Sequence, residues 1–151
     1  MVRSCQALWL APLLLGLLGA ASPEPSGPGW GTHMMEVGAR FALAASAAHA
    51  GNFLLADYEL DELGEVLGRA RATPQPDDVP REVKLAGLAD AFVRETLPAL
   101  RAAARKADRR AFQTAWATAV LQCNACHKTA GKPFLKVLAA PKGTTVLDLT
   151  P

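Results

Sequence analysis

Apolar residues recur every three or four positions through most of the chain between residues 33 and 131. This spacing places them along one face of an α-helix, with charged residues on the opposite face. Amphipathic helices joined by short connections bury their apolar faces best when they pack side by side in alternating directions. We therefore predict an all-α fold, an antiparallel four-helix bundle with an irregular C-terminal tail. The predicted helices are roughly His33–Ala50, Phe53–Ala72, Arg81–Lys106 and a last helix that follows Asp108 and ends near Gly131.

Short sequence signals mark the ends of these helices. Gly51 and Asn52 interrupt the pattern after the first helix, and the Pro-rich segment 73–80 is predicted to be a loop. Pro98 lies inside the third helix and should kink it, because proline lacks an amide hydrogen and its ring displaces a carbonyl of the preceding turn. Asp108 is a candidate N-cap for the fourth helix.

Residues 1–21 are predicted to be a cleaved signal peptide and not part of the fold. Arg3 supplies a positive charge, Leu8–Leu18 is apolar, and the small residues Gly19–Ala21 follow, as a signal peptidase requires. The alternative is a transmembrane anchor, which needs about 20 apolar residues, and this run is shorter. Cleavage would remove Cys5 and leave a periplasmic bacterial protein with no membrane anchor.

The remaining chain divides into three segments. Residues 22–32 are rich in Pro and Gly and are predicted to be a flexible leader, residues 33–131 form the bundle, and residues 132–151 form the tail. Alanine is abundant whereas aromatic residues make up 6% of the chain, which favours closely packed helices over sheets. The formal net charge of +2 is too small to indicate nucleic-acid binding.

Five consecutive residues in the fourth helix carry the clearest chemistry: Cys123-Asn124-Ala125-Cys126-His127. Cysteines three residues apart lie on one face of a helix, so both sulfur atoms can form thioethers with the two vinyl groups of one haem. The adjacent histidine can then ligate the iron of the same haem, which is what the Cys-x-x-Cys-His pattern requires. We predict one haem c, attached covalently through Cys123 and Cys126, with His127 as an iron ligand.

Other uses of a cysteine pair fit the sequence less well. A structural zinc site needs four ligands, and the remaining histidines, His33 and His49, lie far from the motif in sequence. A thioredoxin-like redox pair is typical of a β-α-β context, and the sequence has no strand pattern. A chance match is disfavoured, because an export signal, two cysteines in the mature chain and an adjacent histidine occur together.

A second iron ligand, on the opposite side of the haem, is less well defined. Methionine sulfur is a common partner of histidine in cytochromes, and the mature chain has two methionines, Met34 and Met35, both on the first helix. Met34 shares its face with Val37 and Phe41, whereas Met35 shares its face with small residues. Either is a candidate iron ligand, with Met34 preferred because its face is more core-like. The alternative is that both methionines fill gaps in the core.

Basic residues near the motif are candidates for pairing with the haem propionates or with an acidic partner. Lys128, Lys132 and Lys136 follow the motif, and Arg40 lies on the first helix. The alternative is that these side chains are only solvated.

The position of the motif resembles that in the cytochrome c′ and cytochrome c-556 group, exported four-helix bundles with Cys-x-x-Cys-His near the end of the last helix. A closer similarity is to bacterial cytochrome c′-like proteins, and it covers most of residues 33–141. The residues that carry this similarity are 39–41, 50–60, Asp108, Phe112, Trp116, the motif itself and 131–135.

This resemblance implies that His127 is the proximal iron ligand. It leaves the opposite side open, because the c-556 type uses a methionine of the first helix whereas cytochrome c′ leaves the iron five-coordinate. The tail, residues 132–151, departs from the c′ pattern, in which the chain ends soon after the haem helix. A tail that folds over the haem edge would weaken any transfer of c′ gas binding to this chain.

Three functions follow, in decreasing order of preference. The first is one-electron transfer with redox partner proteins, because six-coordinate iron has no vacant position for a substrate. The second is binding or sensing of nitric oxide or carbon monoxide by five-coordinate iron. The third is catalysis, which needs a distal acid–base group that the sequence does not place, so we predict that the chain is not an enzyme. A homodimer is left open.

Overall fold

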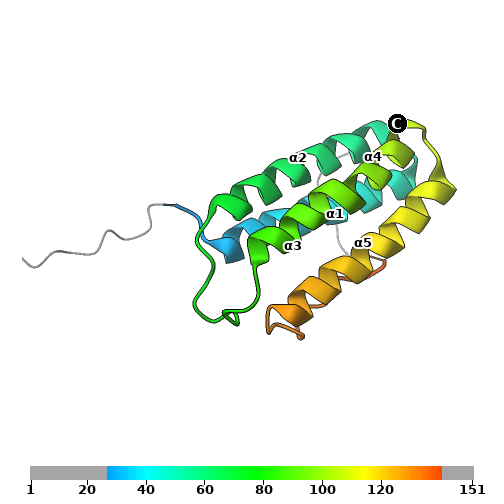
Figure 1. Ribbon diagram of the computed structural model, residues 1–151. Helices are drawn as coiled ribbons and strands as arrows, with labels where there is room; N and C mark the ends of the chain where they lie inside the picture. Colours follow the sequence, from blue (N-terminus) through cyan, green and yellow to red (C-terminus); the bar gives the residue numbers. More distant parts are fainter. Residues whose placement is uncertain (1–26, 141–151) are drawn as a thin grey trace, which may run out of the picture.

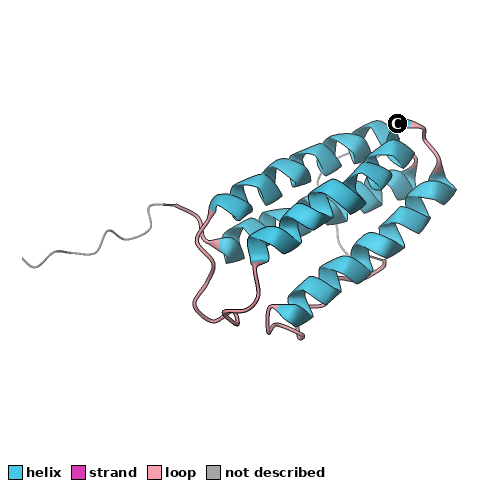
Figure 2. Cartoon of the chain, viewed as in Figure 1, coloured by secondary structure: helices cyan, strands magenta, loops and turns pink. Residues whose placement is uncertain are grey.

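Helices account for all the regular secondary structure between residues 27 and 140, the part of the chain that the computed structural model describes (Figure 2). They are α1 (Trp30–Ala50), α2 (Phe53–Ala72), α3 (Leu85–Ala91), the π-helical turn η1 (Phe92–Thr96), α4 (Leu97–Arg105) and α5 (Arg109–Thr129). Because α3, η1 and α4 form one continuous helix, four long helices pack side by side, which confirms the predicted all-α fold (Figure 1). The predicted signal peptide, the start of the leader and the end of the tail lie outside the described residues.

Helix α1 begins at Trp30, before the predicted start at His33, so residues 30–32 belong to the helix and not to the leader. The earlier start of α1 is explained by a long-range contact, which the spacing of apolar residues along α1 cannot reveal. The indole Nε1 of Trp30 donates to the carbonyl of Thr73 at 3.0 Å, and the ring is buried. The ring of His33 lies 3.2 Å from the hydroxyl of the same threonine. The first turn of α1 is therefore held against the end of α2.

A tight turn connects α1 to α2, as the glycine between them predicts. Gly51 has a φ of 90°, in the left-handed region that favours glycine, and its amide donates to the carbonyl of Ala48. Asn52 then caps α2, because its side chain accepts a hydrogen bond from the amide of Leu55 at 3.1 Å. The observed bounds of α2 are those predicted from the sequence.

The third helix begins at Leu85 and not at Arg81, so its predicted start is wrong. Residues 81–84 are non-helical. The side chain of Gln75, in the preceding loop, accepts a hydrogen bond from the amide of Leu85 at 3.0 Å and so supplies a partner for the first turn. Sequence periodicity could not reveal this partner, because it lies ten residues away.

The disturbance predicted at Pro98 takes the form of the π-helical turn η1. The amide of Leu97 donates to the carbonyl of Phe92, five residues back instead of four. Proline has no amide hydrogen to donate, and its ring displaces the carbonyl four residues before it. A wider turn directly before the proline accommodates this displacement.

Helix α5 has a well-defined cap at each end. The carboxylate of Asp108 accepts a hydrogen bond from an amide of the first turn at 2.9 Å, as predicted. At the other end Gly131 has a φ of 77°, and the amides of Gly131 and Lys132 donate to the carbonyls of Lys128 and His127. These two bonds form a Schellman motif, which fixes the turn that contains His127.

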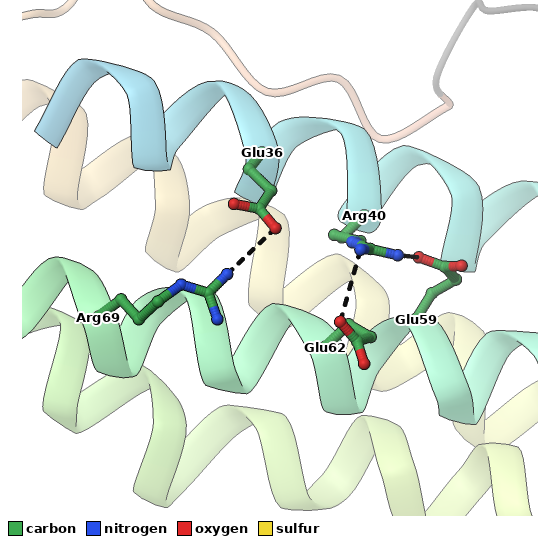
Figure 3. A network of polar contacts seen from close by, with 5 residues as sticks. All are labelled: Glu36, Arg40, Glu59, Glu62 and Arg69. Atoms are coloured by element: carbon green, nitrogen blue, oxygen red, sulfur yellow. Dashed lines mark hydrogen bonds and ion pairs between the residues drawn. The ribbon is translucent and has the colours of Figure 1, made fainter. Parts of the chain in front are cut away.

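Ion pairs join α1 to α2 along one side of the bundle (Figure 3). Arg40 lies 3.0 Å from Glu59 and 3.4 Å from Glu62, and Arg69 lies 3.1 Å from Glu36. The side chain of Glu59 is only 2% exposed, and a carboxylate buried without a partner would cost on the order of several kcal/mol. The hydrogen bond to Glu59 raises the pKa of Arg40, so the guanidinium group remains charged.

The largest fully buried apolar side chains of the core include Leu60 and Leu63 of α2 and Leu100 of α4. Helix α1 packs extensively against α2 but only lightly against α5, so the bundle is closed on one side and looser on the other. Between residues 27 and 140, no helix combines the length and the apolar character that crossing a bilayer requires.

Candidate functional site

A cavity of about 370 Å³ lies between α1 and α5. Its walls are mostly apolar and come from α1, α2, the third helix, α5 and the segment that follows α5. Cys123, Cys126 and His127 line it from α5, and Met34 lines it from α1. The fold thus brings four of the five predicted site residues together around one space.

Two aromatic rings and two small residues explain why this space is open. Phe41 of α1 stacks on Trp116 of α5, with the ring centroids 3.8 Å apart and an angle of 18° between the planes. Both rings line the cavity, so the stack holds α1 and α5 at a fixed separation beside it. Gly38 and Ala42 form part of the α1 wall, and a Cβ added to Gly38 would meet no atom within 4 Å. Larger residues at these positions would fill the cavity.

Cys123 and Cys126 are free thiols, one turn apart on α5 and half-buried in the cavity wall. Burial, with a smaller effect of Cys126, raises the pKa of the Cys123 thiol to about 12, and burial also raises the pKa of Cys126. A redox-active cysteine works as a thiolate and needs a lowered pKa. The shifts here are in the opposite direction, so the pair presents two neutral sulfur atoms to the cavity.

His127 is oriented by a hydrogen bond from its ring to the main chain. Its Nδ1 lies 2.9 Å from the carbonyl oxygen of Leu135. Because a carbonyl oxygen only accepts, Nδ1 carries the hydrogen, and in the neutral tautomer that this selects Nε2 has a free lone pair. Metal-ligating histidines typically donate their second ring N–H to a fixed acceptor in this way. The ring is therefore prepared to bind a metal through Nε2.

The two candidate methionines occupy different environments. Met34 lines the cavity, on the wall opposite α5. Met35 is 79% exposed and does not line the cavity, because neighbouring residues of a helix point about 100° apart. The structure therefore brings Met34, and not Met35, together with the motif.

The basic candidates also differ in their surroundings. Lys136 lines the cavity, and Lys128 is exposed. Lys132 lies 2.6 Å from Asp78, and this hydrogen bond and charge lower the pKa of that carboxyl group. Arg40 is engaged by glutamates of α2. Among these four candidates, Lys136 is the cation beside the cavity.

The other two histidines lie away from the motif. His33 is buried at the start of α1 beside Thr73. His49 lines a second cavity, of about 490 Å³, together with Phe53 and Arg109. Neither histidine lines the cavity that contains the motif. Within residues 27–140, no three His, Cys, Asp or Glu side chains are grouped so as to hold a metal ion among themselves.

Asn124 has a role that the sequence did not predict. Its side chain pairs with the main chain of Val137: Nδ2 donates to the carbonyl at 3.0 Å, and Oδ1 accepts from the amide at 2.8 Å. The Nε1 of Trp116 likewise donates to a main-chain carbonyl of this segment, that of Ala139, at 2.8 Å. The Cys-x-x-Cys-His pattern leaves position 124 unspecified and main-chain acceptors carry no residue signature, so no sequence signal was available for these contacts.

Comparisons of the chain with protein-family models, with curated proteins and with solved structures gave no match. The similarity to the cytochrome c′ and c-556 group therefore stays a prediction. It is supported by the motif and by the position of the motif at the end of the last helix of an all-α bundle.

Proposed function

We propose that this chain is a c-type cytochrome that transfers single electrons, with one haem attached through Cys123 and Cys126 and ligated by His127. The observation that carries the proposal is that these residues and Met34 line one largely apolar cavity between α1 and α5. The donor set fits haem, because two neutral thiols and an imidazole nitrogen with a free lone pair belong to the same wall. The apolar walls suit a flat, largely apolar macrocycle.

The residues of the cavity then have distinct roles. Haem, when bound, supplies an iron that alternates between the ferric and ferrous states. His127 provides the proximal nitrogen, and Met34 is our candidate for the second ligand because it lines the opposite wall. The stacked rings of Phe41 and Trp116 supply apolar surface for the macrocycle, and Lys136 is the candidate partner for a propionate.

Export and partners are part of the same proposal. The predicted signal peptide supports a periplasmic location, and the position of the motif in α5 supports similarity to the cytochrome c′ and c-556 group. The partners of a single-electron carrier are other redox proteins. A protein with five-coordinate iron would instead bind nitric oxide or carbon monoxide, and the following experiment separates the two.

Absorption spectra of the holoprotein, oxidised and reduced, with and without carbon monoxide, test electron transfer against gas binding. We expect a methionine–iron charge-transfer band in the oxidised protein and no response to carbon monoxide. High-spin ferric iron with a strong carbon monoxide response would reject the carrier and favour gas binding.

The same spectra of two variants test the second ligand. Met34→Ala should abolish the charge-transfer band and create a carbon monoxide response, because the cavity loses its thioether sulfur. Met35→Ala is the matched control, since Met35 is the adjacent residue and is exposed, and its spectra should equal those of the wild type. Wild-type spectra for Met34→Ala would show that Met34 is not a ligand.

A further inference from the structure

We propose that Asn124 is a positioning residue for His127. It acts through residues 132–140, which we call the strap. In this proposal the side chain of Asn124 holds the strap so that the carbonyl of Leu135 meets Nδ1 of the histidine ring. The inference rests on the proposed function, because the orientation of His127 matters for an iron ligand.

The side-chain amide of Asn124 is both a donor and an acceptor of hydrogen bonds to the strap. Its Nδ2 donates to the carbonyl of Val137 at 3.0 Å, while its Oδ1 accepts from the amide of the same residue at 2.8 Å. The carbonyl that accepts from His127 belongs to Leu135, two residues earlier on the strap. Holding Val137 thus limits where the Leu135 carbonyl can lie.

The strap leaves α5 at Lys132, whose amide donates to the carbonyl of His127, and then runs antiparallel to α5 with hydrogen bonds to three of its side chains. His127 pairs with Leu135, Asn124 with Val137, and Trp116 with Ala139. An extended chain rises about 13 Å from Leu135 to Ala139, and α5 rises about 16 Å from Trp116 to His127. These lengths match an extended segment along the helix, in which Asn124 is the contact next to the histidine.

The acceptor on Nδ1 affects the chemistry of a bound iron. Donation of the N–H to a carbonyl makes the imidazole a stronger base and a stronger donor to the metal. A stronger donor favours ferric over ferrous iron and lowers the reduction potential. Loss of the Asn124 contact should therefore free the Leu135 carbonyl, weaken this hydrogen bond and raise the potential.

The test uses holoprotein of the wild type and of Asn124→Ala, with two readouts: the reduction potential, and the exchange rate of the His127 Nδ1 proton observed by NMR in the ferrous state. We expect a more positive potential and exchange about tenfold faster, because one hydrogen bond no longer protects the proton. Asn124→Asp retains an acceptor for the Val137 amide and loses the donor, so its values should lie between those of the other two proteins.

Two further variants separate positioning from general damage. Ala125→Ser changes the other variable position of the motif, which is exposed, and should leave both readouts unchanged. Val137→Pro removes the amide that donates to Asn124 and leaves the motif intact, so it should shift both readouts in the same direction as Asn124→Ala. If Asn124→Ala yields no holoprotein, Val137→Pro alone tests whether the contact between Asn124 and the strap positions His127.

Failure of this inference is distinguishable from failure of the proposed function. Absence of covalent haem from the wild type would overturn the proposed function. Holoproteins of Asn124→Ala and Val137→Pro with wild-type potential and wild-type proton exchange would overturn the positioning role and leave the cytochrome intact.

Discussion

The two sides of helix α1 are built in different ways. Toward α2 it is joined by ion pairs, in which Arg40 reaches two glutamates and one of these, Glu59, is almost completely buried. Toward α5 it meets the stacked rings of Phe41 and Trp116, and beside that stack the cavity opens. One helix therefore closes the bundle on one face and leaves it open on another.

This difference shows how a bundle of ordinary helices keeps a cavity open. Small residues, such as Gly38 and Ala42, remove volume from the α1 wall, and the aromatic stack prevents α5 from closing onto it. The closed side, where α1 packs extensively against α2, then contributes more to the stability of the fold. Variants on the open side should change ligand binding, whereas variants on the closed side should change stability.

The largest effect is expected from filling the cavity through Gly38→Phe. An added Cβ at Gly38 meets no atom within 4 Å, so the ring can enter the space without displacing the core. We expect the helical fold to remain and covalent haem to fall by about tenfold or more, because volume that the ligand needs is occupied. Helicity from circular dichroism and haem content per protein measure the two outcomes.

Gly68→Phe is the matched control, because Gly68 lies on α2 with open space around its Cβ position and does not line the cavity. It should retain haem. Full haem content in Gly38→Phe would contradict the assignment of the site to this cavity.

A thiol measurement probes the same side of the molecule without haem. Because the pKa of Cys123 is about 12, the haem-free protein at pH 8 should have about a thousandfold less thiolate at this residue than an ordinary cysteine with a pKa of 9. Alkylation by iodoacetamide should be correspondingly slow and should rise about tenfold per pH unit up to pH 11.

The raised pKa of Cys123 also predicts the direction in which the stability of the fold changes with pH. A raised pKa means that the stability contribution is complete below pH 9 and is lost as the pH rises toward 12, because the unfolded state releases its proton first. Protein unfolded in urea should react at the ordinary rate. Equally fast alkylation of the folded and unfolded protein would show that Cys123 is not buried in the cavity wall.

A smaller effect is expected on the closed side, from Arg40→Met. This change leaves Glu59 buried without its partner and should lower the free energy of unfolding by about 2–3 kcal/mol in urea denaturation. Arg69→Met is the control: both members of its pair are substantially exposed, so it should cost less than about 1 kcal/mol. Equal losses from the two variants would refute the contrast between the two sides.

The helix ends that depend on nearby residues could be predicted from the sequence. The bounds of α2, the cap at Asp108 and the turn at Gly51 follow from residues within one turn of each helix end. The starts of α1 and of the third helix were wrong because each depends on a distant partner. Thr73 holds the first turn of α1, and Gln75 holds the first amide of α3.

The residues of the candidate site were also predictable where they form a local pattern, and not where they depend on contacts between distant segments. Cys123, Cys126 and His127 form a local pattern, so their identity was available from the sequence. The choice between Met34 and Met35 depends on the rotation of α1 against α5, which periodicity alone left open. The acceptor of His127 could not be predicted, because it is a main-chain carbonyl on a segment without periodicity.

The central claim is that the cavity between α1 and α5 holds a haem bonded covalently to both cysteines. Intact-mass measurement and a pyridine haemochrome spectrum of protein matured in a host that attaches haem c test it most directly. We predict the mass of one haem on the wild type with a spectrum typical of two thioethers. Cys123→Ala and Cys126→Ala should each give the spectrum of a single thioether or lose the haem. A wild-type protein that carries no covalent haem under these conditions would contradict the account.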